Sequence, residues 1–84
     1  MDIRVLLLGP LSDLAARDIV HIDIAAGQVC DWTCLLGALP PALAAAVAEP
    51  RVRIACDGEV LREKTSLAAA PGAEIALLPP VSGG

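Results

Sequence analysis

The sequence is poor in aromatic, basic and histidine residues. Its 84 residues include one tryptophan, no phenylalanine or tyrosine, one histidine, and six lysines and arginines against ten acidic residues, which gives a formal net charge of −4. Proteins that bind nucleic acid need a basic surface and often stack bases on aromatic rings. The composition therefore argues against a nucleic-acid partner, and an acidic protein of this kind suits a basic protein partner better.

The chain also lacks a long apolar run and has an odd number of cysteines. Three cysteines without a recognisable signal peptide predict a reducing compartment, so we expect a cytoplasmic protein. The apolar stretch 3–8 is too short for the hydrophobic part of a signal peptide. The longest apolar run, 35–48, contains Pro40 and Pro41 and is shorter than the about 20 residues that span a membrane. No membrane segment is expected.

What the sequence has is a high content of aliphatic residues. Hydrophobic residues make up 56% and charged residues 19%, which is typical of a folded domain with a real core. A chain of 84 residues is long enough for one domain only. Since aromatic side chains are nearly absent, we expect a core of leucine, isoleucine, valine and alanine.

Alternation of apolar and polar residues predicts a protein rich in β-strands. A strand is expected wherever side chains of alternate parity are apolar and a turn sequence follows. The turns are Gly9-Pro10, Ala25 to Gly27, Asp57-Gly58 and Pro71-Gly72, and Asp57-Gly58 is typical of a two-residue hairpin. The expected strands are 3–8, 19–24, 51–56, 59–61 and 74–78.

The apolar spacing changes to three and four residues in the middle of the chain, which is typical of an amphipathic helix. The residues that follow this spacing are Val29, Trp32, Leu35, Leu36 and Leu39. Pro40 should end this main helix, and Pro41 can begin a second helical segment that runs through residue 48. We expect loops elsewhere: 11–18, with a helical turn at 14–16, and 62–70, with a turn near Ser66.

The last residues form an apolar strand followed by two prolines and a glycine pair. Pro79 and Pro80 cannot donate a backbone hydrogen bond, so they should end the pairing and keep the chain stiff and extended. Residues 79–84 can reach roughly 20 Å. Glycines 83 and 84 leave the terminal carboxylate open to a partner. We therefore divide the chain into a domain, 1–78, and a projecting tail, 79–84.

This ending closely resembles that of a known family. The run that carries the resemblance is Leu77-Leu78-Pro79-Pro80-Val81-Ser82-Gly83-Gly84. It resembles the terminus of the small subunit of molybdopterin synthase, the MoaD-type branch of the MoaD/ThiS ubiquitin-like sulfur carriers. The resemblance implies an α+β fold of the β-grasp (ubiquitin-like) type. This fold has a mixed five-stranded sheet, one main helix on one face, and the first and last strands parallel at the sheet centre.

The resemblance also implies a function for the tail. A MoeB-type adenylyltransferase would use ATP to adenylate Gly84, and a sulfur donor protein would convert it to a thiocarboxylate. Leu78 to Gly83 would enter the MoaE-type large subunit, where the sulfur passes to cyclic pyranopterin monophosphate during molybdenum cofactor biosynthesis. Two loaded carriers serve each product, in a heterotetramer. The carrier would bind no cofactor or metal itself and would be the sulfur-donating, non-catalytic subunit of the synthase.

Other functions stay open at this point. The same chemistry would serve a sulfur carrier for thiamin or cysteine biosynthesis. A ubiquitin-like modifier that forms isopeptide bonds, or an interaction domain with an inert tail, would have a similar sequence. The residues 1–78 contain no paired carboxylates and no phosphate-binding glycine loop that would indicate an active site of their own.

The cysteines and the histidine have simple structural interpretations. Cys30 and Cys34 are expected on the main helix, and Cys56 has the inward parity of its strand. We expect all three as small apolar residues in or near the core, since a metal site would need more ligands than this chain offers. His21 lies on the polar parity of its strand and is expected to be solvated.

Strand parity also divides the sheet into two faces. The residues expected to face the helix are Ile3, Val5, Leu7, Val52, Ile54, Ile75 and Leu77. The residues expected to face away are Leu6, Leu8, Arg53, Ala55, Ala76 and Leu78. An apolar patch with a basic residue on an open sheet face is typical of a docking surface, and incidental exposure is the alternative.

Overall fold

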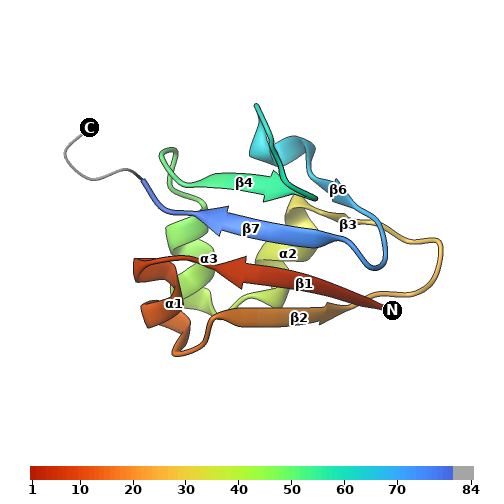
Figure 1. Ribbon diagram of the computed structural model, residues 1–84, viewed down its shortest axis with the longest axis horizontal. Helices are drawn as coiled ribbons and strands as arrows, with labels where there is room; N and C mark the ends of the chain where they lie inside the picture. The colour runs from red at the N-terminus through yellow and green to blue at the C-terminus, as the bar shows by residue number, and fades with distance from the viewer. Residues whose placement is uncertain (81–84) are drawn as a thin grey trace.

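The computed structural model describes residues 1–80 and has an α+β architecture (Figure 1). A five-stranded sheet has the order β2-β1-β7-β4-β5, and β3 and β6 form a separate two-stranded sheet. The elements in chain order are β1 (Asp2–Leu7), α1 (Pro10–Ala15), β2 (Ile19–Asp23), β3 (Cys30–Asp31), α2 (Trp32–Ala38), α3 (Pro41–Val47), β4 (Arg53–Cys56), β5 (Glu59–Val60), the 3₁₀ helix η1 (Lys64–Ser66), β6 (Ala68–Ala69) and β7 (Glu74–Leu78).

The first and last strands lie together at the centre of the sheet. β1 and β7 are parallel, with Val5 opposite Ile75 and Leu7 opposite Leu77. β2 is antiparallel to β1, and β4 is antiparallel to β7. This confirms the predicted β-grasp sheet, in which the parallel pair forms between the two ends of the chain. Because the strands are parallel, β7 ends on the same side as β1, away from Met1 (Figure 1).

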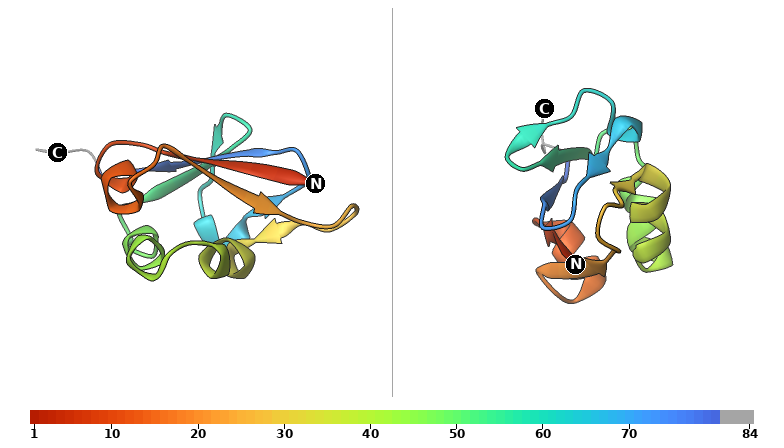
Figure 2. Two further views of the ribbon diagram at one scale, coloured as in Figure 1. Left: turned by 90° about the horizontal axis from the view of Figure 1, so that it is seen from below. Right: turned by 90° about the vertical axis from the view of Figure 1, so that its right-hand side faces the viewer.

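The helices α2 and α3 lie next to one another on one face of the sheet (Figure 2), and α1 lies at the end where β1 and β2 are connected (Figure 1). The main helix is shorter than we expected, because it begins at Trp32 and not near Val29. Asp31 caps it, its carboxylate accepting a hydrogen bond from the Cys34 N–H at 2.9 Å. Val29 is 55% exposed. The second helical segment was predicted correctly and begins with Pro41 in its first turn.

Three short elements, α1, β3 and β6, differ from the sequence prediction. The segment after β1 is a full helix, α1, and not a loop with a turn at 14–16. Pro10 occupies its first turn and Leu11 is buried, while Ala16 ends it in the left-handed conformation with φ 55°. β6 was not predicted either, because alanine favours helices over strands; here Ala69 pairs with Cys30 across two segments far apart in sequence.

The core is aliphatic, as the composition predicts. All seven residues expected to face the helices are buried. Within residues 1–80 no polar or charged side chain is buried. The core cluster consists of Ile3, Val5, Leu7, Leu11, Val20, Ile22, Cys30, Leu35, Leu39, Leu43, Val47, Val52, Ile54, Leu67, Ala69, Ala73, Ile75 and Leu77. None of the helices in the described part of the chain combines the length and hydrophobicity that crossing a bilayer requires.

Lys64 fixes the start of β4 to the helical layer. Its ammonium group donates hydrogen bonds to the backbone oxygens of Val47 at 2.7 Å and Val52 at 2.9 Å, and also to that of Glu49. The same nitrogen lies 5.6 Å from the centre of the Trp32 ring. Desolvation by burial lowers the pKa of Lys64, although the charge of Glu49 opposes this. One side chain thus satisfies three carbonyls at the end of α3 and before β4.

Candidate functional site at the end of β7

The candidate site begins where the central strand β7 ends. Ile75 and Leu77 are fully buried between the sheet and the helices, whereas Leu78 is half-buried on the opposite face. Leu78 lies directly opposite Arg53 of β4. Because the last strand is held by neighbours on both sides, the chain leaves the sheet at a fixed position. The predicted end of the strand at Leu78 is confirmed.

Pro79 packs close to the chain segment that connects β1 with α1. A Cβ atom at Gly9 would lie 3.5 Å from Cγ of Pro79, an ordinary contact. Gly9 itself has a backbone φ of 55°, a conformation that residues other than glycine rarely adopt. The sequence predicts a strand end at Gly9-Pro10 but does not predict that it lies beside the tail. Only the parallel pairing of β1 with β7 brings the two together.

A shallow hollow of about 340 Å³ lies at this point. Its walls come from α1, the end of α3, the start of β4 and the two prolines. The lining residues are Pro10, Leu11, Leu14, Ala46, Glu49, Arg51, Val52, Pro79 and Pro80. Leu14 is 52% exposed on its rim. The first two tail residues therefore belong to a partly apolar surface that could contact a partner protein.

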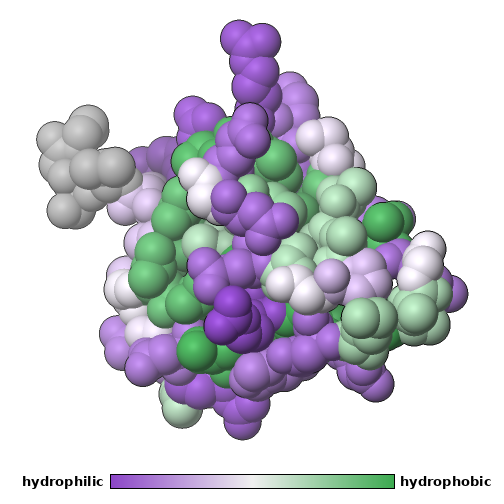
Figure 3. Space-filling view, turned by 45° about the vertical axis from the view of Figure 1, so that its right-hand side comes forward, coloured by the Kyte–Doolittle hydropathy of each residue, from purple (hydrophilic) through white to green (hydrophobic). Residues whose placement is uncertain are grey.

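The outer sheet face changes from polar to apolar towards the tail. Its outward residues near the start of β1 and β7 form an ion pair, Arg4 with Glu74 at 3.2 Å, and His21 pairs with Asp2 at 2.8 Å. Further along, the outward residues are Leu6, Leu8, Ala76 and Leu78. Figure 3, an oblique view of the molecule, shows hydrophobic side chains among hydrophilic ones on its surface.

The predicted outward patch needs one correction and two additions. Ala55 has the outward parity but is only 7% exposed, because its small methyl group lies between Val60 and Ala76 on the neighbouring strands. Val60 is 52% exposed, and Ile19, opposite Leu6, is 38% exposed. Parity within β2 and β5 could have identified both residues as outward. The patch therefore extends over the whole width of the sheet.

Part of the predicted site lies outside the described residues. Leu78, Pro79 and Pro80 are described, and they lie together at the end of β7. Val81, Ser82, Gly83 and Gly84, which include the expected site of adenylation and sulfur loading, lie beyond them. The division into a domain, 1–78, and a tail, 79–84, stays a prediction.

The cysteines are packed against the core as expected, but one was assigned to the wrong element. Cys30 is in β3 and not on the helix; it is fully buried, and burial together with the neighbouring Cys34 raises its pKa to about 12. Cys34 and Cys56 are half-buried at the edge of the core. Burial and the charge of Asp57 raise the pKa of Cys56. A thiol with a raised pKa is a weak nucleophile at neutral pH.

The remaining candidate groups do not assemble into a catalytic or metal site. His21 is exposed, as predicted, and its partner is the exposed carboxylate of Asp2. Within residues 1–80 there is no group of three or more histidine, cysteine, aspartate or glutamate residues that could hold a metal ion. In the described part of the molecule, the outer sheet patch and the start of the tail therefore stay the candidates for contact with a partner.

The fold defines the class: this is a ubiquitin-like β-grasp protein. A family model confirms the relationship, since the ThiS family model matches residues 5–84, almost the whole chain. The chain belongs to the ThiS family, and it has the fold of the MoaD/ThiS-type ubiquitin-like sulfur carriers. No curated protein matches the sequence.

Three solved structures show the same fold. Small archaeal modifier protein 1 from Haloferax volcanii is 26% identical, with a TM-score of 0.74 and 100% of both chains covered. The protein of the same name from Methanosarcina acetivorans is 24% identical, with a TM-score of 0.76, 99% of this chain and 96% of that chain covered. A chain in the complex of subunits 1 and 2 of molybdopterin-converting factor from Helicobacter pylori is 23% identical, with a TM-score of 0.66 and 100% of both chains covered.

Proposed function

We propose that this protein is the sulfur carrier subunit of a molybdopterin synthase. The observation that carries the proposal is the sequence Pro79-Pro80-Val81-Ser82-Gly83-Gly84 at the end of a ThiS-family chain, directly after a strand anchored at the centre of the sheet. The carboxylate of Gly84 carries the sulfur, and the β-grasp domain presents it to partner enzymes.

The chemistry requires activation of the carboxylate. A carboxylate with a pKa of about 3.5 is ionised at neutral pH and is a poor electrophile. The carboxylate attacks the α-phosphorus of ATP and pyrophosphate leaves, which gives an acyl-adenylate whose AMP group is a good leaving group. Hydrosulfide supplied by a donor protein then attacks the acyl carbon, AMP leaves, and a thiocarboxylate remains on Gly84. The sulfur of this group is the nucleophile in the next transfer, to cyclic pyranopterin monophosphate.

This function needs three kinds of partner. We propose an adenylyltransferase of the MoeB type, a sulfur donor protein, and a large synthase subunit of the MoaE type that holds the catalytic groups. The likeness to a chain of the two-subunit molybdopterin-converting factor supports the large subunit. The carrier itself binds no cofactor, and ATP is bound by the activating enzyme. Two carriers serve each product in a heterotetramer, and the compartment is the cytoplasm.

Mass spectrometry tests the proposal directly. After incubation with the cognate adenylyltransferase, ATP and a sulfur source, the protein should gain the mass of one exchange of oxygen for sulfur at Gly84. Deletion of Gly84 should abolish this gain, because the reacting carboxylate moves one residue back along the chain. Addition of the large subunit and cyclic pyranopterin monophosphate should return the carrier to the carboxylate form as molybdopterin accumulates.

Other outcomes of the same assay distinguish the related pathways. A loaded carrier that is discharged only by a thiazole-forming or a cysteine-forming enzyme would keep the sulfur-carrier function and refute the molybdopterin assignment. A protein that no adenylyltransferase modifies would refute the carrier function altogether. In that case an interaction domain with an inert tail is the better description.

A ubiquitin-like modifier is the second candidate. The specific observation in its favour is the likeness to small archaeal modifier protein 1, with a TM-score of 0.74 over the full length of both chains. A modifier would form an isopeptide bond between Gly84 and lysines of other proteins. Adducts that disappear when Gly84 is deleted, detected by immunoblotting of cells that express a tagged protein, would support this function.

A further inference from the structure

The basic residues of this acidic protein are gathered in one part of the fold. Six lysines and arginines stand against ten acidic residues in the sequence. Four of the six lie on or near β4: Arg51, Arg53, Arg62 and Lys64. The net charge of the whole molecule is negative and predicts a basic partner. The side chains next to the start of the tail, in contrast, are mainly basic.

None of these four residues forms an ion pair within residues 1–80, and three of them, the arginines, also make no side-chain hydrogen bond there. Lys64, the fourth, donates to backbone carbonyls. The ion pairs in the described part of the chain are Met1 with Asp23, Arg4 with Glu74, and His21 with Asp2. None of these pairs includes the exposed residues Arg51, Arg53 and Arg62, which we call the arginine strip. The guanidinium groups of the strip can therefore bind a partner without breaking an ion pair of residues 1–80.

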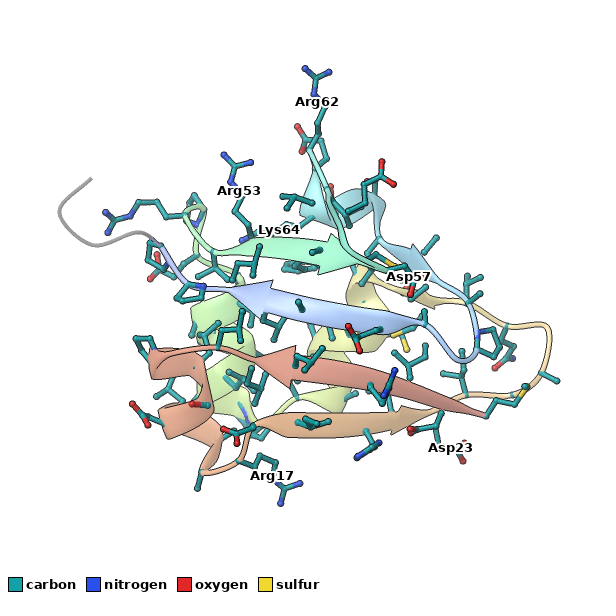
Figure 4. All side chains as sticks on the ribbon, viewed as in Figure 1. Arg17, Asp23, Arg53, Asp57, Arg62 and Lys64 are labelled. Carbon is teal, nitrogen blue, oxygen red and sulfur yellow. The ribbon has the colours of Figure 1, made fainter. Side chains whose placement is uncertain are left out.

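The arginine strip lies beside the point where the tail leaves the sheet. Arg53 is directly opposite Leu78, so the two side chains share the outer face next to Pro79. Arg51 lines the hollow of about 340 Å³ together with Pro79 and Pro80. Arg53 and Arg62 line a second hollow of about 300 Å³. Figure 4 shows Arg53 and Arg62 projecting beyond β4, at the edge of the sheet opposite to the β2 edge, where Arg17 lies.

The chemistry of the strip favours carboxylates of a protein. Guanidinium groups bind carboxylates through two parallel hydrogen bonds, and arginine is favoured over lysine at such interfaces. A nucleic acid would be repelled by the net charge of −4 and would find a single aromatic ring in the chain. Two carboxylates of this chain, Glu49 and Glu63, also line the hollows, against four basic residues, so positive charge is in excess there.

We propose that the arginine strip docks against an acidic surface of the adenylyltransferase that activates the tail. This proposal rests on the proposed function, because the strip lies at the start of the segment that the enzyme must receive. The apolar outer residues Leu6 and Leu78 supply contact area, and the strip supplies orientation and a faster encounter. The arginines act as docking residues only and do not touch the reacting carboxylate.

Charge reversal at one arginine, matched by reversal at a distant one, tests the strip. Arg53→Glu and Arg17→Glu change the net charge equally, and both side chains are exposed on opposite sides of the sheet (Figure 4). In the adenylation assay with the cognate enzyme at low ionic strength, Arg53→Glu should raise the KM for the carrier about tenfold or more, because like charges then meet. The kcat should stay unchanged, and Arg17→Glu should leave both constants within about twofold.

Further measurements separate docking from folding and from other partners. Arg53→Lys keeps the positive charge, so its KM should lie between those of the wild type and Arg53→Glu. Added salt should lower kcat/KM less in Arg53→Glu than in the wild type, because the variant has lost a favourable charge contact that salt screens. Should Arg53→Glu not fold by circular dichroism, Arg62→Glu replaces it, with the same expected rise in KM. Equal KM values for the Arg53→Glu and Arg17→Glu proteins would overturn the proposal.

Three results would also overturn it and identify the reason. Binding of a single-stranded oligonucleotide by the wild type, lost in Arg53→Glu, would assign the strip to nucleic acid. A wild-type protein that the cognate enzyme does not adenylate would refute the proposed function together with the strip. A wild type that is loaded normally, with Arg53→Glu loaded equally well, would refute the strip alone.

Discussion

At the scale of single residues, Lys64 does more for the fold than its sequence position suggests. It lies in a polar segment, where a lysine usually points to solvent. In the structure its ammonium group satisfies the carbonyls of Val47, Glu49 and Val52. No pattern in the sequence connects residue 64 with residues 47–52, because the contact depends on how η1 packs beside α3.

Replacement of Lys64 by methionine should therefore lower stability. The apolar stem keeps its contacts, while the carbonyls of Val47 and Val52 lose their donor and that of Glu49 keeps only the Val52 N–H, so we expect a loss of about 1–3 kcal/mol in the free energy of unfolding. Arg62→Met is the matched control, since Arg62 is exposed and makes no ion pair within residues 1–80. It should change the free energy by no more than about 0.5 kcal/mol. Urea denaturation measures both, and equal losses would contradict the role of Lys64.

The cysteines give a second prediction at this scale. Burial raises the pKa of Cys30 from its ordinary value of 9.0 to about 12, so its thiol stays protonated near neutral pH. In the folded protein Cys30 should react with iodoacetamide far more slowly than the half-buried Cys34. Peptide mapping after labelling at about pH 8, near the pKa of an ordinary thiol, measures the difference, which should vanish in denaturant. Fast labelling of Cys30 in the native protein would show that its burial is incomplete in solution.

The pKa of Cys30 also predicts the direction of a pH effect. The folded state keeps the proton to a higher pH than the unfolded state, so the contribution of Cys30 to stability is complete below pH 9.0. It is lost as the pH rises from 9.0 to about 12. Denaturation curves recorded across this window should show wild-type stability falling more steeply than that of a Cys30→Ala variant. Parallel curves for the two proteins would contradict the raised pKa.

At the scale of elements, the sequence predicted the strands of the main sheet well and the short elements poorly. The five strands were found because period-two patterns are bounded by the turns Gly9-Pro10, Ala25 to Gly27, Asp57-Gly58 and Pro71-Gly72. α1 was not predicted because only Leu11 of its six residues is buried, which leaves almost no helical periodicity. β3 and β6 are two residues each and depend on pairing between distant segments. Such pairing leaves no local signal in the sequence.

The two faces of β7 give a prediction at this scale. Ile75 and Leu77 are fully buried, whereas Leu78 is half-buried on the outer face. Replacement of Leu77 by alanine should cost about 2–5 kcal/mol of unfolding free energy, because a cavity forms under the helices. Leu78→Ala should cost less than about 1 kcal/mol. Chemical denaturation of the two variants measures the difference, and similar losses would contradict the assignment of the faces.

At the scale of the whole molecule, the sequence predicted the family of the tail but not the surface around it. The resemblance carried by residues 77–84 points to the same family as the match over residues 5–84. The position of Arg53 beside Leu78 could not be predicted, because the register of β4 against β7 joins residues that are far apart in the chain. The net charge of −4 could not show this position either, because it is a single sum over the chain and does not say where the basic residues gather.

The arrangement separates stability from function, and this leads to a last prediction. Leu77 completes the core and β7 ends at Leu78, so we expect the domain to fold without the last two residues. A protein that lacks Gly83 and Gly84 should unfold within about 0.5 kcal/mol of the wild type, because no core side chain is removed. It should nevertheless fail to gain sulfur in the mass assay, since its terminal carboxylate then belongs to Ser82, which has a side chain and comes two residues earlier in the chain.

Leu77→Ala is the matching variant for this truncation, because it removes a core side chain and leaves the tail intact. It should show the opposite behaviour: lower stability, but normal sulfur loading at temperatures where it remains folded. Urea denaturation and the mass assay, applied to both proteins, measure the two properties independently. If both variants lost stability and loading together, the tail would be part of the folded core, and the division of the chain at residue 78 would be wrong.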